Sequence, residues 1–219
     1  MRNVIVASAL VMVVMAGTDP ADARARPADW NSGYAGLEGG YGWGSVKQSF
    51  GNIGGPLNNQ RGSTNQDGAV AGVYSGYNWV FDPRWLLGVE GNLDWTDIGT
   101  NKVGTGATNP VYMHWEGSFR GRFGVLVSPS VLLYGTGGYS LIDGSLKALN
   151  RQIETQSATF GGWTVGLGVE WALDKVSVLR LQYRYSDYGA QRESFPAHGY
   201  DVSATPLLST VTMGVNFRF

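Results

Sequence analysis

The sequence predicts an all-β fold, namely an eight-stranded antiparallel up-and-down transmembrane β-barrel. Three observations support this prediction. Eight segments alternate between apolar and polar residues, the connections between them alternate between short and long, and the charges in the interior of the strands fall on one face. Because successive side chains of a strand point to opposite faces, each segment has one apolar and one polar face.

The composition indicates one domain built from strands and turns. The 219 residues include 33 glycines, and 12% are aromatic while only 15% are charged. A formal net charge of -1, with no block of like charge, argues against nucleic acid as a partner. The chain has no cysteine, which excludes disulfides and thiolate metal sites.

The N-terminus predicts export. A basic residue precedes an apolar run over residues 4–16, which is shorter than the roughly 20 residues of a membrane helix and matches a signal peptide. Small residues two positions apart follow, so we expect cleavage after Ala23 or Ala25. We therefore assign residues 1–25 to a signal peptide and 26–219 to the barrel. A buried helix of a cytoplasmic protein is the alternative, but a polar stretch ends the run where processing would occur.

The remaining chain contains eight candidate strands and no further run of membrane-helix length. The strands are expected at residues 33–44, 68–81, 85–97, 112–127, 131–142, 159–173, 176–188 and 209–219. Three connections are tight turns, at 82–84, 128–130 and 174–175, and four are long polar loops, at 45–67, 98–111, 143–158 and 189–208. This alternation of short and long connections is typical of an outer-membrane barrel, with short periplasmic turns at one rim and long extracellular loops at the other.

The two faces of these strands differ in chemistry. The odd-numbered face is apolar and aromatic and carries no charge in the interior of the strands; Asp97 and Asp187 lie at strand ends. The even-numbered face is rich in glycine and carries ten charged residues: Glu38, Glu90, Asp94, Glu116, Arg120, Arg122, Glu170, Arg180, Arg184 and Arg218. A soluble barrel or sandwich would bury the apolar face, but that face is too bulky for an eight-stranded interior, which side chains just fill. We therefore expect the apolar face to contact lipid and the charged face to line the lumen.

Aromatic residues on the apolar face gather near both expected rims. One group lies near the short turns: Trp79, Phe81, Trp85, Trp171, Phe217 and Phe219. The other lies near the long loops: Trp43, Trp95, Trp115, Trp163 and Tyr185. Sugar stacking is an alternative use of the tryptophans near the loops, but their lipid-facing parity favours membrane-interface girdles.

The luminal charges comprise five acids and five arginines, and this balance predicts ion pairs inside the barrel. We expect Glu170 and Arg180 to lie diagonally across the last tight hairpin, and Glu90 and Arg120 across the preceding hairpin. Removing one partner would leave a buried charge uncompensated. These pairs and Tyr134 are expected to interrupt the lumen, with only water pockets between them.

Four short motifs occur in order along the mature chain: GYNW at 76–79, LYGTGG at 133–138, GWTVGLGVE at 162–170 and VNFRF at 215–219. They resemble the small porin-like outer-membrane β-barrel family, the immunogenic surface antigens of Gram-negative bacteria. The resemblance implies an OmpA-type eight-stranded barrel with a role in envelope integrity or surface interaction. It also implies insertion by the barrel assembly machinery, with the terminal aromatic residues Phe217 and Phe219 as the signal. Because the chain ends at the last strand, we expect no separate peptidoglycan-binding domain.

Motifs that carry enzymatic chemistry are scarce. The sequence has no phosphate-binding loop between a strand and a helix, no zinc spacing and no nucleophile elbow. A symmetric hairpin would place His114 opposite Asp94, where a carboxylate could orient the imidazole as a base. No nucleophile accompanies them, so we expect a local hydrogen bond and no catalysis. His198 and Tyr200 in the last loop could ligate or stack on a haem, but we expect an ordinary exposed loop, and no metal or cofactor.

Two functions of different classes remain open. The first is a structural surface barrel with a charge-plugged lumen, whose long extracellular loops serve envelope integrity or surface interaction. The second is a small-solute porin, and a haem-binding or adhesin barrel is a further alternative. The expected partners are outer-membrane lipid and lipopolysaccharide, the barrel assembly machinery during biogenesis, and an extracellular ligand that the sequence does not identify.

The predicted closed sheet should make the folded protein resistant to detergent. A closed barrel satisfies its backbone hydrogen bonds internally and has no free edge in lipid. Unboiled and boiled samples should therefore migrate differently in a denaturing gel. Identical mobility, together with a helical circular dichroism spectrum after refolding in micelles, would contradict the fold.

Overall fold

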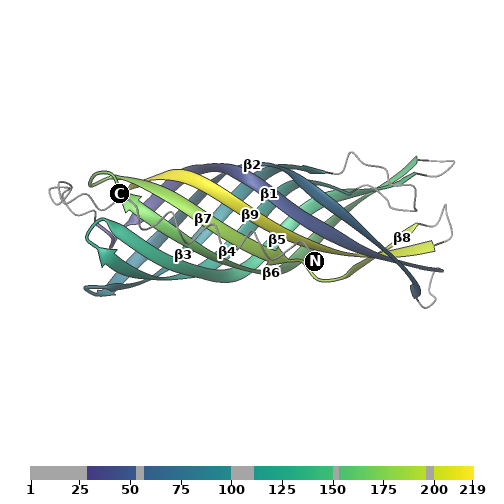
Figure 1. Ribbon diagram of the computed structural model, residues 1–219, viewed down its shortest axis with the longest axis horizontal. Helices are drawn as coiled ribbons and strands as arrows, with labels where there is room; N and C mark the ends of the chain where they lie inside the picture. Colours follow the sequence, from purple (N-terminus) through teal and green to yellow (C-terminus); the bar gives the residue numbers. More distant parts are fainter. Residues whose placement is uncertain (1–28, 53–56, 100–110, 150–152, 196–199) are drawn as a thin grey trace, which may run out of the picture.

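The computed structural model describes residues 29–52, 57–99, 111–149, 153–195 and 200–219, so the predicted signal peptide lies outside the described residues. Nine strands form one antiparallel sheet in the order β1-β2-β3-β4-β5-β6-β7-β9-β8, and pairing of β1 with β9 closes it. The strand β8 pairs with β9 alone, so the barrel itself has eight strands (Figure 1). The predicted eight-stranded antiparallel barrel is confirmed. Among the described residues, no helix is long and apolar enough to cross a membrane.

Most of the strands are longer than a membrane crossing requires. Their bounds are β1 Gly33–Asn52, β2 Leu57–Asp82, β3 Trp85–Gly99, β4 Val111–Ser128, β5 Val131–Leu149, β6 Ile153–Ala172, β7 Ser177–Asp187, β8 Gln191–Phe195 and β9 Tyr200–Arg218. A transmembrane β-strand needs only about 9–11 residues. With 20 residues in β1 and 26 in β2, the first hairpin extends well beyond the lipid.

Three of the four predicted long loops, at 45–67, 143–158 and 189–208, are mostly strand, so the sequence-based boundaries there were wrong. Residues 100–110 of the fourth lie outside the described residues. The ladder between β1 and β2 continues as far as Gly51 and Leu57, and the ladder between β5 and β6 as far as Leu149 and Ile153. Glycine, asparagine, serine and glutamine are typical of loops, which is why these segments were assigned to them. Outside the lipid, however, a hairpin needs only its backbone hydrogen bonds to continue.

The loop predicted over residues 189–208 likewise contains β8 and the first part of β9. The two strands form an arm at the end of the barrel opposite the C-terminus (Figure 1). Gly189 precedes this arm with a φ of 66°, a conformation that glycine adopts without steric cost. Its N–H donates to Asp187 Oδ1 at 3.0 Å, at the break between β7 and β8, which both run antiparallel to β9.

The opposite rim has the tight turns that the sequence predicts. Asp82 Oδ1 accepts the backbone N–H of Arg84 at 3.0 Å. Asp174 Oδ1 accepts the N–H groups of Val176 and Ser177, each at 2.7 Å. These backbone bonds favour the charged carboxylate and lower the pKa of Asp174. Aspartate thus stabilises two turns through its side chain, as its frequency at turns suggests.

The barrel is inside out relative to a soluble protein, as predicted. Large apolar side chains on the outer face are exposed, among them Leu167 at 70%, Leu37 at 67% and Phe119 at 66%. Each of the ten charged luminal residues is at most 6% exposed. Such an outer face is stable only in contact with lipid.

Aromatic pairs lie on the outer face near both rims. Near the short turns, Trp85 stacks on Phe123 with ring centroids 5.1 Å apart. Towards the other rim, Trp95 stacks on Trp115 at 5.8 Å. Both pairs join neighbouring strands, and their positions match the two interfacial girdles of a membrane barrel.

The parity of the faces can be tested at Leu167. Replacing Leu167 by Arg should destabilise the barrel in lipid by ~2–4 kcal/mol, because the new charge faces hydrocarbon near mid-strand. Leu167→Ala is the control for lost side-chain volume. Urea unfolding in lipid vesicles measures both variants. Equal stability of the Arg and Ala variants would show that this face does not contact lipid.

Candidate functional site

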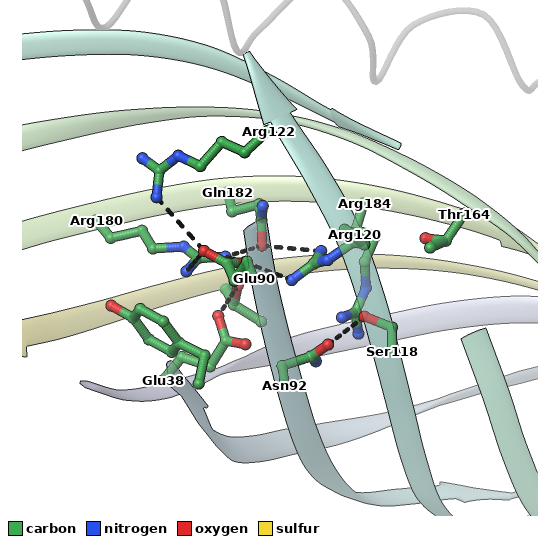
Figure 2. A network of polar contacts seen from close by, with 12 residues as sticks. Glu38, Glu90, Asn92, Ser118, Arg120, Arg122, Thr164, Arg180, Gln182 and Arg184 are labelled. Atoms are coloured by element: carbon green, nitrogen blue, oxygen red, sulfur yellow. Dashed lines mark hydrogen bonds and ion pairs between the residues drawn. The ribbon is translucent and has the colours of Figure 1, made fainter. Parts of the chain in front are cut away.

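The lumen holds a connected network of charged side chains centred on Glu90 (Figure 2). Glu90 Oε1 accepts from Arg120 Nη2 at 2.6 Å and from Arg180 Nη2 at 2.9 Å. Glu90 Oε2 accepts from Arg180 Nη1 at 2.9 Å and from the Tyr34 hydroxyl at 2.8 Å. Arg122 Nη1 lies 3.4 Å from the same oxygen. One carboxylate thus faces three guanidinium groups, and all four charged side chains are fully buried.

The arrangement follows from the width of the barrel. Glu90 of β3 lies directly opposite Arg120 of the neighbouring strand β4. Arg180 belongs to β7, which is not adjacent to β3, and so reaches Glu90 across the lumen. An eight-stranded interior is narrow enough for this contact. Arg180 binds Glu90 through two hydrogen bonds, which is the bidentate geometry that a planar guanidinium group forms with a carboxylate.

The predicted pair of Glu170 and Arg180 is not formed. The two residues are directly opposite, not diagonal, yet Arg180 turns to Glu90. Glu170 instead contacts Arg122 Nη2 at 2.8 Å and Arg218 Nη2 at 3.3 Å. Glu90 and Arg120 do pair, also directly opposite and not diagonally. Sequence spacing predicts contacts only between neighbouring strands. In a narrow lumen, side chains from non-adjacent strands also reach one another and can replace those contacts.

A second cluster lies around Arg184. Its Nη2 donates to Asp94 Oδ2 at 2.7 Å and to Glu116 Oε2 at 2.8 Å. Asp94 and Glu116 lie opposite one another on β3 and β4, so Arg184 of β7 separates two like charges. The Ser140 hydroxyl adds a hydrogen bond to Glu116 Oε1 at 2.8 Å, and Asn92 donates to Asp94. The cation and these neutral donors together offset the desolvation of both acids.

The predicted pairing of His114 with Asp94 was wrong. Glu116, not His114, lies opposite Asp94. His114 is exposed, at a register shift between Met113 and Trp115. The hairpin between β3 and β4 is therefore not symmetric about the predicted loop. In the described part of this hairpin, Asp94 is therefore not placed to orient the imidazole.

Glu38 differs from the other luminal acids. It accepts a hydrogen bond from the Thr212 hydroxyl at 2.8 Å and is buried. Among the described residues, no arginine or lysine lies within ion-pair distance of Glu38. The numerical balance of acids and arginines thus does not produce five separate pairs, because Glu90 alone engages three of the cations.

Tyrosine rings support the guanidinium groups. Arg122 lies over the Tyr134 ring at 3.9 Å, and Arg180 lies over the Tyr74 ring at 4.1 Å. Cation–π contacts of this kind stabilise a cation where water is excluded. Tyr134, which the sequence places in the lumen as an obstruction, is buried at the edge of the network.

Buried apolar side chains lie towards both ends of the charged region, and the sequence analysis did not predict them. Near the short turns, Trp30 forms a cluster with Leu86, Leu132, Tyr134 and Val178. On the other half of the strands, six inward apolar residues are at most 2% exposed: Val46, Val70, Ile98, Ile142, Phe160 and Leu208. Their even residue numbers place the strand residues on the inner face, so the alternation could have identified them. Trp30 precedes β1, so strand periodicity gave no signal for it.

The other predicted site residues lie at the ends of the chain or outside the described side chains. His198 lies outside the described residues; Tyr200 begins β9, but its side chain is not among those described. Phe217 and Phe219 are exposed, and the backbone of Phe219 bonds to Gly33 at 3.0 and 3.2 Å. In the described part of the chain, no group of three or more His, Cys, Asp or Glu could hold a metal ion.

Comparisons with known proteins agree with this architecture. Residues 6–219 match the family model for the outer membrane protein beta-barrel domain. The chain is 30% identical to the 31 kDa outer-membrane immunogenic protein of Brucella melitensis, with 100% of both chains covered. It is 35% identical to the 25 kDa outer-membrane immunogenic protein of Brucella ovis, over 78% of this chain and 76% of that one. Among solved structures, the outer membrane protein OprG from Pseudomonas aeruginosa is similar in fold, with a TM-score of 0.54, 11% identity, and coverage of 86% of this chain and 97% of that one.

The central role of Glu90 can be tested by Glu90→Gln, which keeps the volume of the side chain and removes its charge. Three buried arginines then lose their shared anion, so the barrel should lose ~3–5 kcal/mol of stability. Asp143→Asn, at an exposed acid, is the matched control and should change little. Urea unfolding of refolded protein measures both. Similar stabilities of the two variants would show that the network does not depend on Glu90.

Proposed function

This chain belongs to the outer membrane protein β-barrel family and lies in the bacterial outer membrane, and we propose that it is a structural surface barrel with a closed lumen. Its function depends on two surfaces. The outer face anchors the protein in lipid, and the strand extensions contact components outside the membrane. The interior holds the barrel together and does not conduct solutes.

The burial of the luminal network is the observation that carries this proposal. All ten charged residues on the inner face are at most 6% exposed, and the contacts around Glu90 reach from β3 to β7 across the lumen. Apolar side chains lie towards both ends of that charged layer. A porin of this size would require these groups to line water, whereas here they contact each other.

The long strands support a role at the cell surface. A membrane crossing uses about 9–11 residues of a strand, and β1, β2, β5, β6 and β9 have at least 19 each. Since the turns at the other rim are tight, the extra length lies at the rim that faces outward in outer-membrane barrels. The sequence of these hairpins is rich in polar residues, and their backbones form continuous ladders. Such a surface suits contact with lipopolysaccharide or with a host or envelope component.

The names of the relatives support the same role. The Brucella proteins are named as immunogenic outer-membrane proteins. We propose that this chain likewise exposes its strand extensions at the cell surface. We propose no catalytic role, because the one histidine and carboxylate considered as a candidate are not opposite one another.

Planar bilayer recording separates the closed barrel from a small-solute porin. Refolded wild-type protein should show no persistent openings of porin size, because ion pairs cross the lumen. Glu90→Ala or Arg120→Ala should increase the frequency of openings, since each removes a side chain from the network around Glu90. Leu167→Ala, on the outer face, is the control and should leave the recordings unchanged. Persistent openings with the wild-type charges intact would refute the plug and favour the porin.

A further inference from the structure

We propose that residues 29–32 form a latch that covers the periplasmic mouth of the barrel and locks the seam between β1 and β9. This segment precedes β1 and contacts the first strands, the last strand and the turn between β4 and β5. The latch does not depend on the proposed function, because its contacts concern closure of the barrel and not the contents of the lumen.

Trp30 is the anchor of the segment. Although it belongs to no strand, it is only 5% exposed and packs with Leu86, Leu132 and Val178, which come from β3, β5 and β7. Its indole N–H donates to the Pro129 carbonyl oxygen at 3.0 Å. A buried tryptophan with its N–H satisfied combines a large apolar contact with a fixed orientation. The ring thus joins several strands at the rim with tight turns.

Arg218 holds the segment from the last strand. Its guanidinium lies 3.7 Å from the centre of the Trp30 ring, and its Nη1 donates to the Asp29 carbonyl oxygen at 3.0 Å. Its Nη2 contacts Glu170 at 3.3 Å. Arg218 therefore links the latch to the luminal network while its neighbour Phe219 pairs with Gly33 at the seam.

Two further hydrogen bonds tie the segment to β2. The Ser32 carbonyl oxygen accepts the N–H of Asn78 at 3.1 Å, and Asn31 Oδ1 accepts the N–H of Val80 at 3.1 Å. The Ser32 hydroxyl donates to the Asp29 carbonyl oxygen at 2.9 Å, which closes the segment into a compact turn. The segment is thus held from β2 on one side and β9 on the other.

The positions of these partners in the chain indicate when the contacts of residues 29–32 form during folding. Arg218 is at the end of β9, whereas Asn78 and Val80 are near the end of β2. The complete set of partners comes together only when β9 pairs with β1 and the barrel closes. A contact formed after the rate-limiting step slows unfolding and leaves folding unchanged. The latch is therefore a late contact that opposes reopening of the seam.

Folding and unfolding kinetics in lipid vesicles test this order. Trp30→Ala should accelerate unfolding by at least about tenfold and leave the folding rate within about a factor of two. Trp79→Ala removes an exposed outer tryptophan and is the matched control for loss of an indole. An equal slowing of folding by Trp30→Ala would overturn the proposal, because the contact would then form before closure.

A double-mutant cycle tests the link between Trp30 and Arg218. Each variant is described by the factor by which it accelerates unfolding. If Trp30 and Arg218 act as one latch, the factor for the double variant Trp30→Ala, Arg218→Gln should be smaller than the product of the two single factors. Trp79→Ala combined with Arg218→Gln should give the simple product. Independent effects of Trp30 and Arg218 would show that no latch couples the segment to the last strand.

A thiol probe keeps the proposal testable if Trp30→Ala does not fold. The chain has no cysteine, so Ser32→Cys introduces a single thiol at a position only 8% exposed. In folded protein this thiol should react slowly with a maleimide, and adding Trp30→Phe, which removes the indole N–H, should increase the rate severalfold. Fast labelling of Ser32→Cys in the barrel with Trp30 intact, or equal rates in both backgrounds, would show that the segment does not close the mouth.

Discussion

The structure depends on one constraint, which is that backbone N–H and C=O groups must be hydrogen-bonded inside the hydrocarbon layer. A sheet meets it only by closing, and β1 does so by pairing with β9 along almost its whole length. Closure at eight strands fixes a lumen that is narrow enough to be filled by side chains. The burial of the charges, their contacts across the barrel and the position of Trp30 follow from that width.

The narrow lumen also explains why the charges form a network and not a set of separate pairs. Glu90 faces Arg120 on the adjacent strand and Arg180 from the opposite wall, so one carboxylate is shared. Removing charges from water is costly, and only several hydrogen bonds per group can offset that cost. Tyr34 and Gln182 supply further polar contacts around the centre. These contacts join opposite walls of the barrel through its interior.

The alternation of residues predicted the fold and the inner face because a period of two is a local property of each strand. It placed Leu167 outside and Glu90 inside. It could not identify Arg180 as a partner of Glu90, because this contact depends on how the sheet curves. It placed the strand ends too early, because outside lipid a ladder continues without apolar side chains. Trp30 lies before the first strand, where periodicity carries no information, so only the folded chain shows its burial.

The network also specifies the register of the strands. A shift of one residue between neighbouring strands reverses which face each side chain takes. Such a shift in β7 would move Arg180 and Arg184 into lipid, where each arginine near the midplane costs ~2–4 kcal/mol. A shift of two residues keeps the faces but takes Arg180 away from Glu90 and Arg184 from Asp94 and Glu116. The apolar outer face alone would tolerate that second shift, since its uncharged side chains would still contact lipid. The buried charges therefore select one register among those that lipid contact permits.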